Sequence, residues 1–177
     1  DQDIFSIDPS GCKDIDDALH YNKNNDLIEV GIHIADVSSY ISVDSPLEVE
    51  ISKRCESQYL DWVQNDMFPT ELVNLMTLSD KKKSRSFSVI IHFDNDYNII
   101  DYSFKKTLIH VNKNMSYEEA EEYINTIHPI SELYKIANVL YDRKYNTDII
   151  KEPFNIHKMV EVYMVLTNVL AAQKIKE

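Results

Sequence analysis

The sequence has little glycine, little cysteine and no long apolar run, and each shortage narrows what the protein can be. Two of its 177 residues are glycine and two are cysteine. The cysteines, Cys12 and Cys55, are too few for a disulfide framework and lack metal-ligand spacing, so we expect a reducing, intracellular setting, cytoplasmic or else nuclear. The apolar runs fall well short of the roughly 20 residues that cross a bilayer, and no signal-peptide pattern is present, so we expect no membrane association.

Positive charge is also scarce. Eighteen lysine and arginine residues face 30 aspartate and glutamate residues, for a net charge of −12. This balance excludes a basic surface that would coat nucleic acid along its length. It does not exclude an enzyme that acts on phosphate esters, because metal ions bring phosphate groups to acidic sites. Any nucleic-acid contact must then be local, or depend on basic groups outside this segment.

Apolar side chains, by contrast, are plentiful and regularly spaced. Hydrophobic residues make up 44% of the chain, and its length suits one domain with a sizeable core. Apolar and β-branched runs predict strands at residues 3–8, 27–34, 86–93, 98–104 and 107–111. Caps and helical periodicity predict helices at residues 46–57, 116–127, from 129 onward and from 155 onward. The predicted fold class is α+β: a mixed, largely antiparallel sheet in the first two thirds with helices packed on it, and a helical C-terminal third.

The most unusual stretch places four carboxylates, Asp8, Asp14, Asp16 and Asp17, within ten residues. A proline and a glycine after the first of them predict that a strand breaks here into a turn, which lets the carboxylates converge. Converging carboxylates cannot all stay ionised without a counter-charge, and Mg²⁺ prefers carboxylate oxygens together with water and phosphate oxygens. A solvated acidic loop is the plainer alternative. Ca²⁺ is a weaker one, because the later glycine and glutamate of an EF-hand loop are missing.

Three other features have both a functional and a structural interpretation. His33 and Asp36 resemble a metal-binding or catalytic pair, but a lone histidine in a strand is more often a core residue. The aromatic residues between 59 and 72 are candidates for stacking on bases, although core or loop anchoring is the simpler interpretation. The basic run at residues 81–85 is typical of a solvated loop, with an RNA phosphate contact as the alternative.

Taken in order along the chain, the motifs resemble those of the ribonuclease II family, whose catalytic RNB domain occurs in processive 3′-to-5′ exoribonucleases. The similar stretches are Ile7-Asp8-Pro9 with Asp14-Ile15-Asp16-Asp17-Ala18-Leu19, residues 30–37, 45–48, 57–60, 67–72, 86–88, 115–120 and 160–161, and residues 164–168. Several motifs in one order across nearly the whole chain make the resemblance specific. It favours a metal site over a solvated loop at the acidic stretch.

The resemblance implies a Mg²⁺-dependent exoribonuclease, with Mn²⁺ as the alternative ion, that releases 5′-nucleoside monophosphates from single-stranded RNA. Asp8, Asp14, Asp16 and Asp17 match the family's metal-binding and catalytic aspartates. Bound there, the ion would activate a water and stabilise the charge that develops on the scissile phosphate.

Three further residues match the family's RNA contacts. Tyr59 matches an aromatic that packs against terminal nucleotides, and Tyr117 matches a tyrosine of the RNA cavity. Glu161 matches a glutamate near the ribose, where contact with a 2′-hydroxyl would help to distinguish RNA from DNA.

The resemblance covers about the first half of a family catalytic domain, so we expect residues 1–177 to be a partial RNB-type domain cut from a longer protein. The rest of that domain, which carries an arginine that aids cleavage, and RNA-binding OB-fold domains would be partners there, and an RNA-degradation complex a further one. Val162 departs from the acidic residue that many relatives have after Glu161, and Phe154 is not matched to the family's second stacking aromatic. The alternative is a truncated or divergent module that binds RNA or protein partners without hydrolysis; a calcium-binding structural domain is a third.

Overall fold

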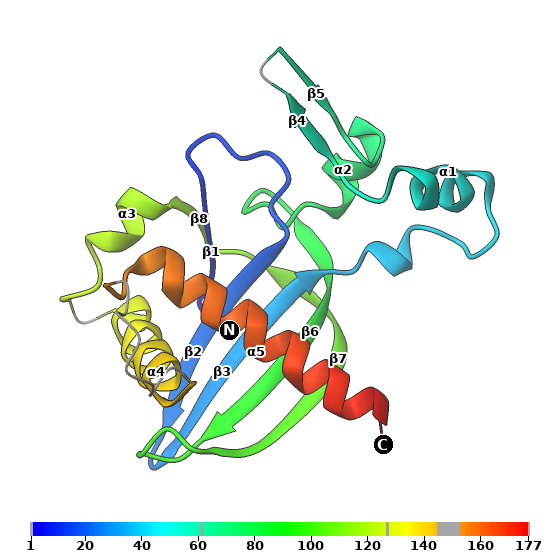
Figure 1. The fold of residues 1–177 in the computed structure, drawn as a ribbon. Helices are drawn as coiled ribbons and strands as arrows, with labels where there is room; N and C mark the ends of the chain where they lie inside the picture. Colours follow the sequence, from blue (N-terminus) through cyan, green and yellow to red (C-terminus); the bar gives the residue numbers. More distant parts are fainter. Residues whose placement is uncertain (1, 61, 127, 145–152, 177) are drawn as a thin grey trace.

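A curled sheet of six strands forms the frame of the molecule (Figure 1). The structure is a computed structural model that describes residues 2–60, 62–126, 128–144 and 153–176. In spatial order the strands are β7 (Ile99–His110), β6 (Lys83–Phe93), β3 (Leu27–Ala35), β2 (Asp17–Asn24), β1 (Ile4–Asp8) and β8 (Lys113–Ser116). Every neighbouring pair is antiparallel except β1 and β8, which run parallel. The predicted α+β class with a mixed, largely antiparallel sheet is confirmed.

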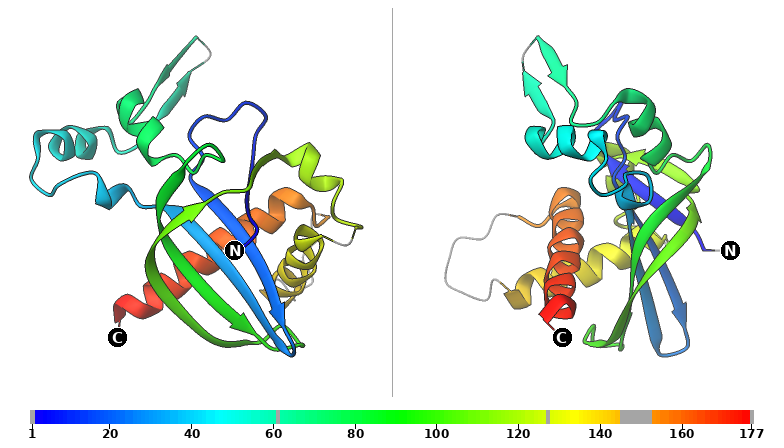
Figure 2. Two further views of the ribbon diagram at one scale, coloured as in Figure 1. Left: turned by 180° about the vertical axis from the view of Figure 1, so that it is seen from behind. Right: turned by 90° about the vertical axis from the view of Figure 1, so that its right-hand side faces the viewer.

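Two long helices, α4 (Pro129–Lys144) and α5 (Ile156–Lys176), cover one face of this sheet (Figure 2). Their buried side chains and the apolar face of the sheet form the main core, which includes Phe5, Val30, Ile32, Ile91, Leu133, Met159 and Tyr163. The Tyr163 hydroxyl donates a hydrogen bond of 2.8 Å to the Leu133 carbonyl, which joins the two helices inside the core. The buried side chains of α5 therefore form the face that packs on the sheet and on α4.

The shorter elements lie at the upper edge of the sheet in Figure 1. They are a 3₁₀ turn η1 (Val37–Ser39), α1 (Pro46–Arg54), the small hairpin of β4 (Gln58–Leu60) and β5 (Val63–Asn65), α2 (Thr70–Met76) and α3 (Tyr117–Glu121). Local capping explains two of these helix starts. Ser45 accepts a hydrogen bond from the Glu48 amide at the start of α1, and Ser116 and Glu119 form a capping box at the start of α3.

Several predicted boundaries are wrong, each for a local reason. The helix predicted to reach residue 57 ends at Arg54, because Cys55 has a positive φ of 63°. The helix predicted over 116–127 ends at Glu121, and hydrogen bonds of the turn type, between residues three apart, follow it. The strands predicted at 98–104 and 107–111 are one strand, β7, because the ladder with β6 continues through the two lysines between them. An edge strand tolerates such charged side chains.

Several short elements were not predicted. The β4–β5 hairpin and α2 occupy the stretch expected to be irregular, between residues 58 and 76. β8 has only four residues and pairs with β1, more than a hundred positions away in sequence. Such short segments carry too few residues to show a clear periodicity.

The other face of the sheet carries a buried polar relay. His20 Nε2 lies 3.2 Å from Glu29 Oε1, His20 Nδ1 lies 2.8 Å from His33 Nε2, and His33 Nδ1 lies 2.7 Å from Ser88 Oγ. Burial lowers the pKa of His20 and lowers that of His33 to about 3, so both rings are neutral. With Glu29 as an acceptor, His20 must donate to Glu29, His33 to His20, and Ser88 to His33. His33 is therefore a satisfied interior residue, as the simpler interpretation of the sequence held.

Gly31 leaves the room that the His20 ring occupies. An added Cβ at Gly31 would lie 2.0 Å from His20 Cε1. We expect Gly31→Ala to lower the free energy of unfolding by about 1–3 kcal/mol, because the ring is buried and cannot move aside. Urea denaturation measures this. In the Gly31→Ala, His20→Ala double variant the two losses should be markedly less than additive, and strictly additive losses would contradict the steric cause.

Candidate active site

The acidic turn, residues 8–17, joins two neighbouring antiparallel strands. Asp8 is the last residue of β1 and Asp17 the first residue of β2. Pairing of Phe5 with Leu19 in this ladder brings the end of β1 next to the start of β2. Between them the chain turns at Gly11, which has a φ of +79°. The predicted break of a strand into a turn is confirmed, and it places carboxylates from both strand ends on one edge of the sheet.

Backbone hydrogen bonds fix the second half of this turn. The Asp16 carbonyl accepts from the Ala35 amide at 2.8 Å, and the Ile15 carbonyl accepts from the Leu78 amide at 2.9 Å. The Thr77 hydroxyl accepts from the Ile15 amide at 2.9 Å and donates to the Lys13 carbonyl at 3.0 Å. β3 and the segment after α2 therefore hold the turn in place, so its carboxylates do not separate freely.

Several carboxyl groups of the turn have raised pKa values. Burial, with added repulsion from Asp8 and Asp16, raises the pKa of Asp17 to about 7. Burial, and then the charges of Asp14 and Asp8, raise the pKa of Asp16. Burial raises the pKa of Asp8 as well, and the charge of Asp14 adds to this, while a hydrogen bond from Ser6 offsets part of the shift. Among the residues that the structure describes, no positive charge thus lowers the pKa of these three carboxyls.

A buried carboxylate oxygen in the turn stands out. Asp8 Oδ2 is buried and accepts no hydrogen bond within the described part of the chain. A buried polar atom without a partner destabilises the fold unless a ligand or solvent satisfies it. The thiol of Cys12 donates a hydrogen bond to Asp14 Oδ1 at 3.5 Å. Burial, and then the negative charge of Asp8, raise the pKa of this thiol to about 11. Cys12 is therefore a neutral thiol at physiological pH.

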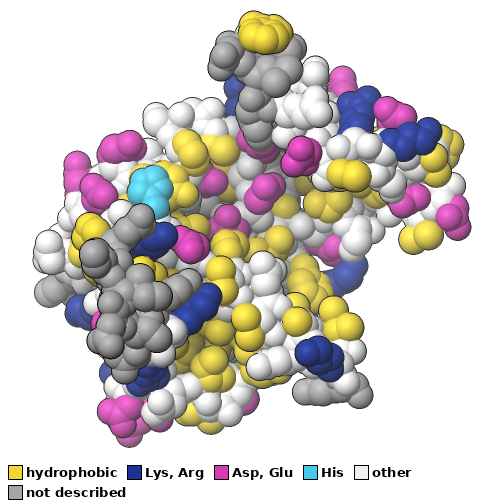
Figure 3. Space-filling model, in the orientation of Figure 1, with side chains coloured by type: hydrophobic (Ala, Val, Ile, Leu, Met, Phe, Trp, Pro, Cys, Tyr) yellow, Lys and Arg dark blue, Asp and Glu magenta, His cyan; other side chains and the backbone are white. Residues whose placement is uncertain are grey.

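The four aspartates do not share one hollow. Asp14 and Asp16 line a groove of about 410 Å³, and Ser57, Met67 and Phe68 also line it. Asp8 lines a separate hollow of about 180 Å³ with Ser116 and Glu119, among others. Within the described ranges, no three His, Cys, Asp or Glu side chains stand close enough together to hold a metal ion. Acidic side chains nevertheless gather on this part of the surface, below the β4–β5 hairpin (Figure 3).

Tyr117 lies next to the acidic turn because of the strand register. β8 pairs with β1 so that Ser116 lies opposite Asp8, and Tyr117 follows directly. Burial raises the pKa of Tyr117, and the charges of Asp8 and Asp17 add to the shift. Its ring stacks on that of His157, with centroids 3.7 Å apart and planes at 22°. His157 carried no sequence signal, because only the packing of α5 against α3 brings it to Tyr117.

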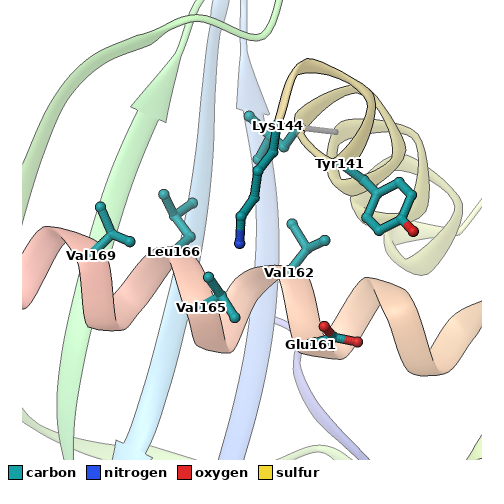
Figure 4. Close-up of a pocket in the computed structure, with 8 residues that line it drawn as sticks. Tyr141, Lys144, Glu161, Val162, Val165, Leu166 and Val169 are labelled. Carbon is teal, nitrogen blue, oxygen red and sulfur yellow. The ribbon is translucent and has the colours of Figure 1, made fainter. Parts of the chain in front are cut away.

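The other two predicted RNA contacts lie on different elements. Tyr59 is on β4, opposite Gln64, and its side chain lies outside the described part of the structure. Glu161 is on α5, where Lys158 Nζ forms an ion pair with it at 2.9 Å. It stands at the end of an apolar groove of about 190 Å³ between α4 and α5, which Val162, Leu166 and other α5 residues line (Figure 4).

The remaining sequence candidates have structural roles. Asp36 is buried and accepts hydrogen bonds from Ser38 and Ser39, and Lys106 forms an ion pair with it at 3.2 Å. These hydrogen bonds and the Lys106 charge outweigh the effect of burial and lower the pKa of Asp36 to about 2. Part of the basic run predicted as a loop belongs to β6, and Lys82 before it donates to backbone carbonyls at the end of α2.

No helix in the part of the chain that the structure describes is both long enough and apolar enough to cross a membrane.

Comparisons with known proteins found a matching family model, related sequences and related structures. The family model described as "RNB domain" matches residues 1–177. The human protein named "Exosome complex exonuclease RRP44" is 31% identical over 206 residues, which cover 98% of this chain and 22% of the human protein. The chain spans less than a third of the length of the curated relatives considered.

Two solved structures share the fold. Mycoplasma genitalium RNase R in complex with ribose-methylated single-stranded RNA aligns with a TM-score of 0.84 and 21% identity, over 98% of this chain and 33% of that one. Yeast Ssd1, described as a pseudonuclease, aligns with a TM-score of 0.75 and 24% identity, over 85% of this chain and 19% of that one. At these identities the likeness establishes the fold alone.

The raised pKa of Asp17 predicts a pH-dependent stability in metal-free buffer. A carboxyl whose pKa is higher in the folded state stabilises the fold below its unfolded pKa, and this contribution is lost as the pH rises through about 7. We expect wild-type protein to lose roughly 1–3 kcal/mol more than Asp17→Asn between about pH 4 and about pH 8. Urea denaturation at each pH, with Asp26→Asn as the control for an exposed aspartate, measures the difference. Parallel curves for wild type and Asp17→Asn would contradict the shift.

Proposed function

Because this chain belongs to the RNB domain family, we propose that it carries the acidic half of the active site of a 3′-to-5′ exoribonuclease. The enzyme would hydrolyse single-stranded RNA to 5′-nucleoside monophosphates. The observation that carries the proposal is the set of raised pKa values of Asp8, Asp16 and Asp17 at the joined ends of β1 and β2, which burial and the charges of neighbouring aspartates cause. A structural loop has no need of such a costly arrangement.

The donor set fits a hard divalent cation. Asp8, Asp14, Asp16 and Asp17 offer only carboxylate oxygens, which Mg²⁺ and Mn²⁺ accept. A bound cation would satisfy the Asp8 Oδ2 atom, which has no partner among the described residues, and would offset the raised pKa values of Asp8, Asp16 and Asp17. When bound, such an ion lowers the pKa of a coordinated water and offsets negative charge on a phosphate. In this proposal the protein's part is to hold the carboxylates rigidly while RNA enters, through the backbone bonds that anchor the turn.

The proposed RNA path starts from the groove that Asp14 and Asp16 line. Its far wall comes from the segments at the base of the β4–β5 hairpin, which also carries Tyr59. Tyr117 lies beside Asp8, and Glu161 lies on α5. In this proposal Tyr59 and Tyr117 contact nucleotides, and Glu161 contacts a ribose 2′-hydroxyl.

The surroundings of the enzyme are part of the proposal. The net charge of −12 makes a purely electrostatic grip on RNA weak. We therefore propose that the remainder of an RNB domain and OB-fold domains supply the opposite wall and most of the RNA affinity in a longer protein. An intracellular, cytoplasmic RNA-degradation complex is the proposed setting, in line with the name of the human exosome exonuclease.

A second candidate is an RNB-like module that binds RNA or protein without hydrolysis. The observation that favours it is the division of the aspartates between two hollows, with no three acidic, histidine or cysteine side chains of the described ranges grouped for a metal ion. The pseudonuclease Ssd1 shares the fold.

Hydrolysis of a 3′-labelled single-stranded RNA in Mg²⁺ separates the two candidates. We expect the full-length protein to release the labelled 3′-terminal mononucleotide in its first step, and a loss of about 100-fold or more in Asp16→Asn. Asp26→Asn, in the turn at the far end of β2, should retain full activity. If the wild-type protein releases no mononucleotide, or Asp16→Asn releases it at the wild-type rate, the proposed nuclease fails.

Metal binding has its own readout. Mg²⁺ should raise the melting temperature of the wild-type chain at about pH 8, because it relieves the repulsion among the ionised carboxylates. Asp8→Asn should show a smaller shift and Asp26→Asn an unchanged one. If Mg²⁺ shifts the melting temperature equally in all three proteins, the ion binds outside the acidic turn.

A further inference from the structure

A stacked pair of aromatic rings, Tyr117 and His157, lies beside the acidic turn. Tyr117 is the first residue of α3, and His157 lies in the first turn of α5. Their ring centroids are 3.7 Å apart and nearly parallel, which is a close face-to-face contact. His157 remains solvent-exposed, whereas Tyr117 is partly buried against the main core. One face of the imidazole is therefore covered by Tyr117, while the residue as a whole is exposed to solvent.

Neighbouring residues hold both members of this stacked pair in place. Ser116, whose side chain caps α3, precedes Tyr117 and pairs with Asp8 across the β1–β8 ladder. His157 follows Ile156, which is fully buried in the main core. Asn155 Oδ1 accepts from the Lys158 amide at 3.0 Å and so caps the start of α5. Little conformational freedom remains to be lost when a flat ligand settles on the outer face of His157.

We propose that His157 is a stacking platform for a nucleobase of the RNA, with Tyr117 as its support. The inference rests on the proposed function and identifies where one base of that substrate lies. Histidine is among the side chains on which unpaired RNA bases stack, and stacking suits a degradative enzyme because it accepts every base.

The position of Glu161 agrees with this proposal. Residues four apart on a helix lie on the same side, one turn from each other, so Glu161 follows His157 along α5. Its side chain is about half exposed, and its ion pair with Lys158 keeps it on the helix surface. A nucleotide with its base on His157 would therefore extend its ribose toward Glu161, the residue proposed to contact the 2′-hydroxyl.

The test is the affinity of the full-length protein for a fluorescently labelled oligoadenylate, measured by anisotropy in EDTA so that no hydrolysis occurs. We expect His157→Ala and His157→Gln to weaken binding about tenfold, because both lose the aromatic face. His157→Phe keeps a flat ring and should bind within about twofold of wild type. His110→Ala removes another exposed imidazole, at the end of β7, and should leave the affinity unchanged.

A second RNA shows whether the effect comes from stacking. In a series of oligoadenylates, each with one abasic nucleotide near the 3′ end, one member should bind wild type and His157→Ala equally. If His157→Ala weakens binding equally for every member of the series, the stacking proposal is wrong. It is also wrong if His157→Gln binds like wild type while His157→Phe does not. Unchanged affinity in His157→Ala, or no measurable RNA binding by the wild-type protein, would likewise contradict the stacking proposal. Release of mononucleotide in Mg²⁺ by the same preparation would show that the proposed nuclease stands even where the platform fails.

Discussion

The crowding of partly desolvated carboxylates in the acidic turn is the constraint around which this molecule is built. Asp8 and Asp17 end and begin two paired strands, and no cation of the protein neutralises them in the part of the chain that the structure describes. Left to itself, such a turn would open toward solvent. Amides of Ala35 and Leu78 hold its backbone closed, and the free energy for this comes from the apolar core that the sheet shares with α4 and α5.

The two faces of the sheet support the acidic turn in different ways. The apolar face binds the helices, and through α5 it positions His157 and Glu161. The polar face carries the relay from Glu29 through His20 and His33, in which burial keeps both rings neutral and fixes the direction of each hydrogen bond. A directional relay across β2 and β3 ties together the strands that carry and anchor the acidic turn.

Distant segments converge on the turn from three directions. β8 delivers Tyr117 from a hundred residues downstream, α5 delivers His157, and the base of the β4–β5 hairpin closes the groove beside Asp14 and Asp16. The result is an edge that offers carboxylates on one side and aromatic rings on another. This combination suits a ligand with phosphates that need a cation and bases that need a flat surface.

Much of this could be predicted from the residues alone. The α+β class, the break at Gly11 and the caps at Ser45 and Ser116 follow from local patterns that depend on near neighbours in the chain. The single β7 strand, the parallel β8, the β4–β5 hairpin and the place of His157 could not, because each depends on a partner far away in sequence. Residue order thus determined which carboxylates are available and where the chain turns. Only the tertiary structure decided which of them are partly desolvated and repel one another, because desolvation and mutual charge depend on what packs around them.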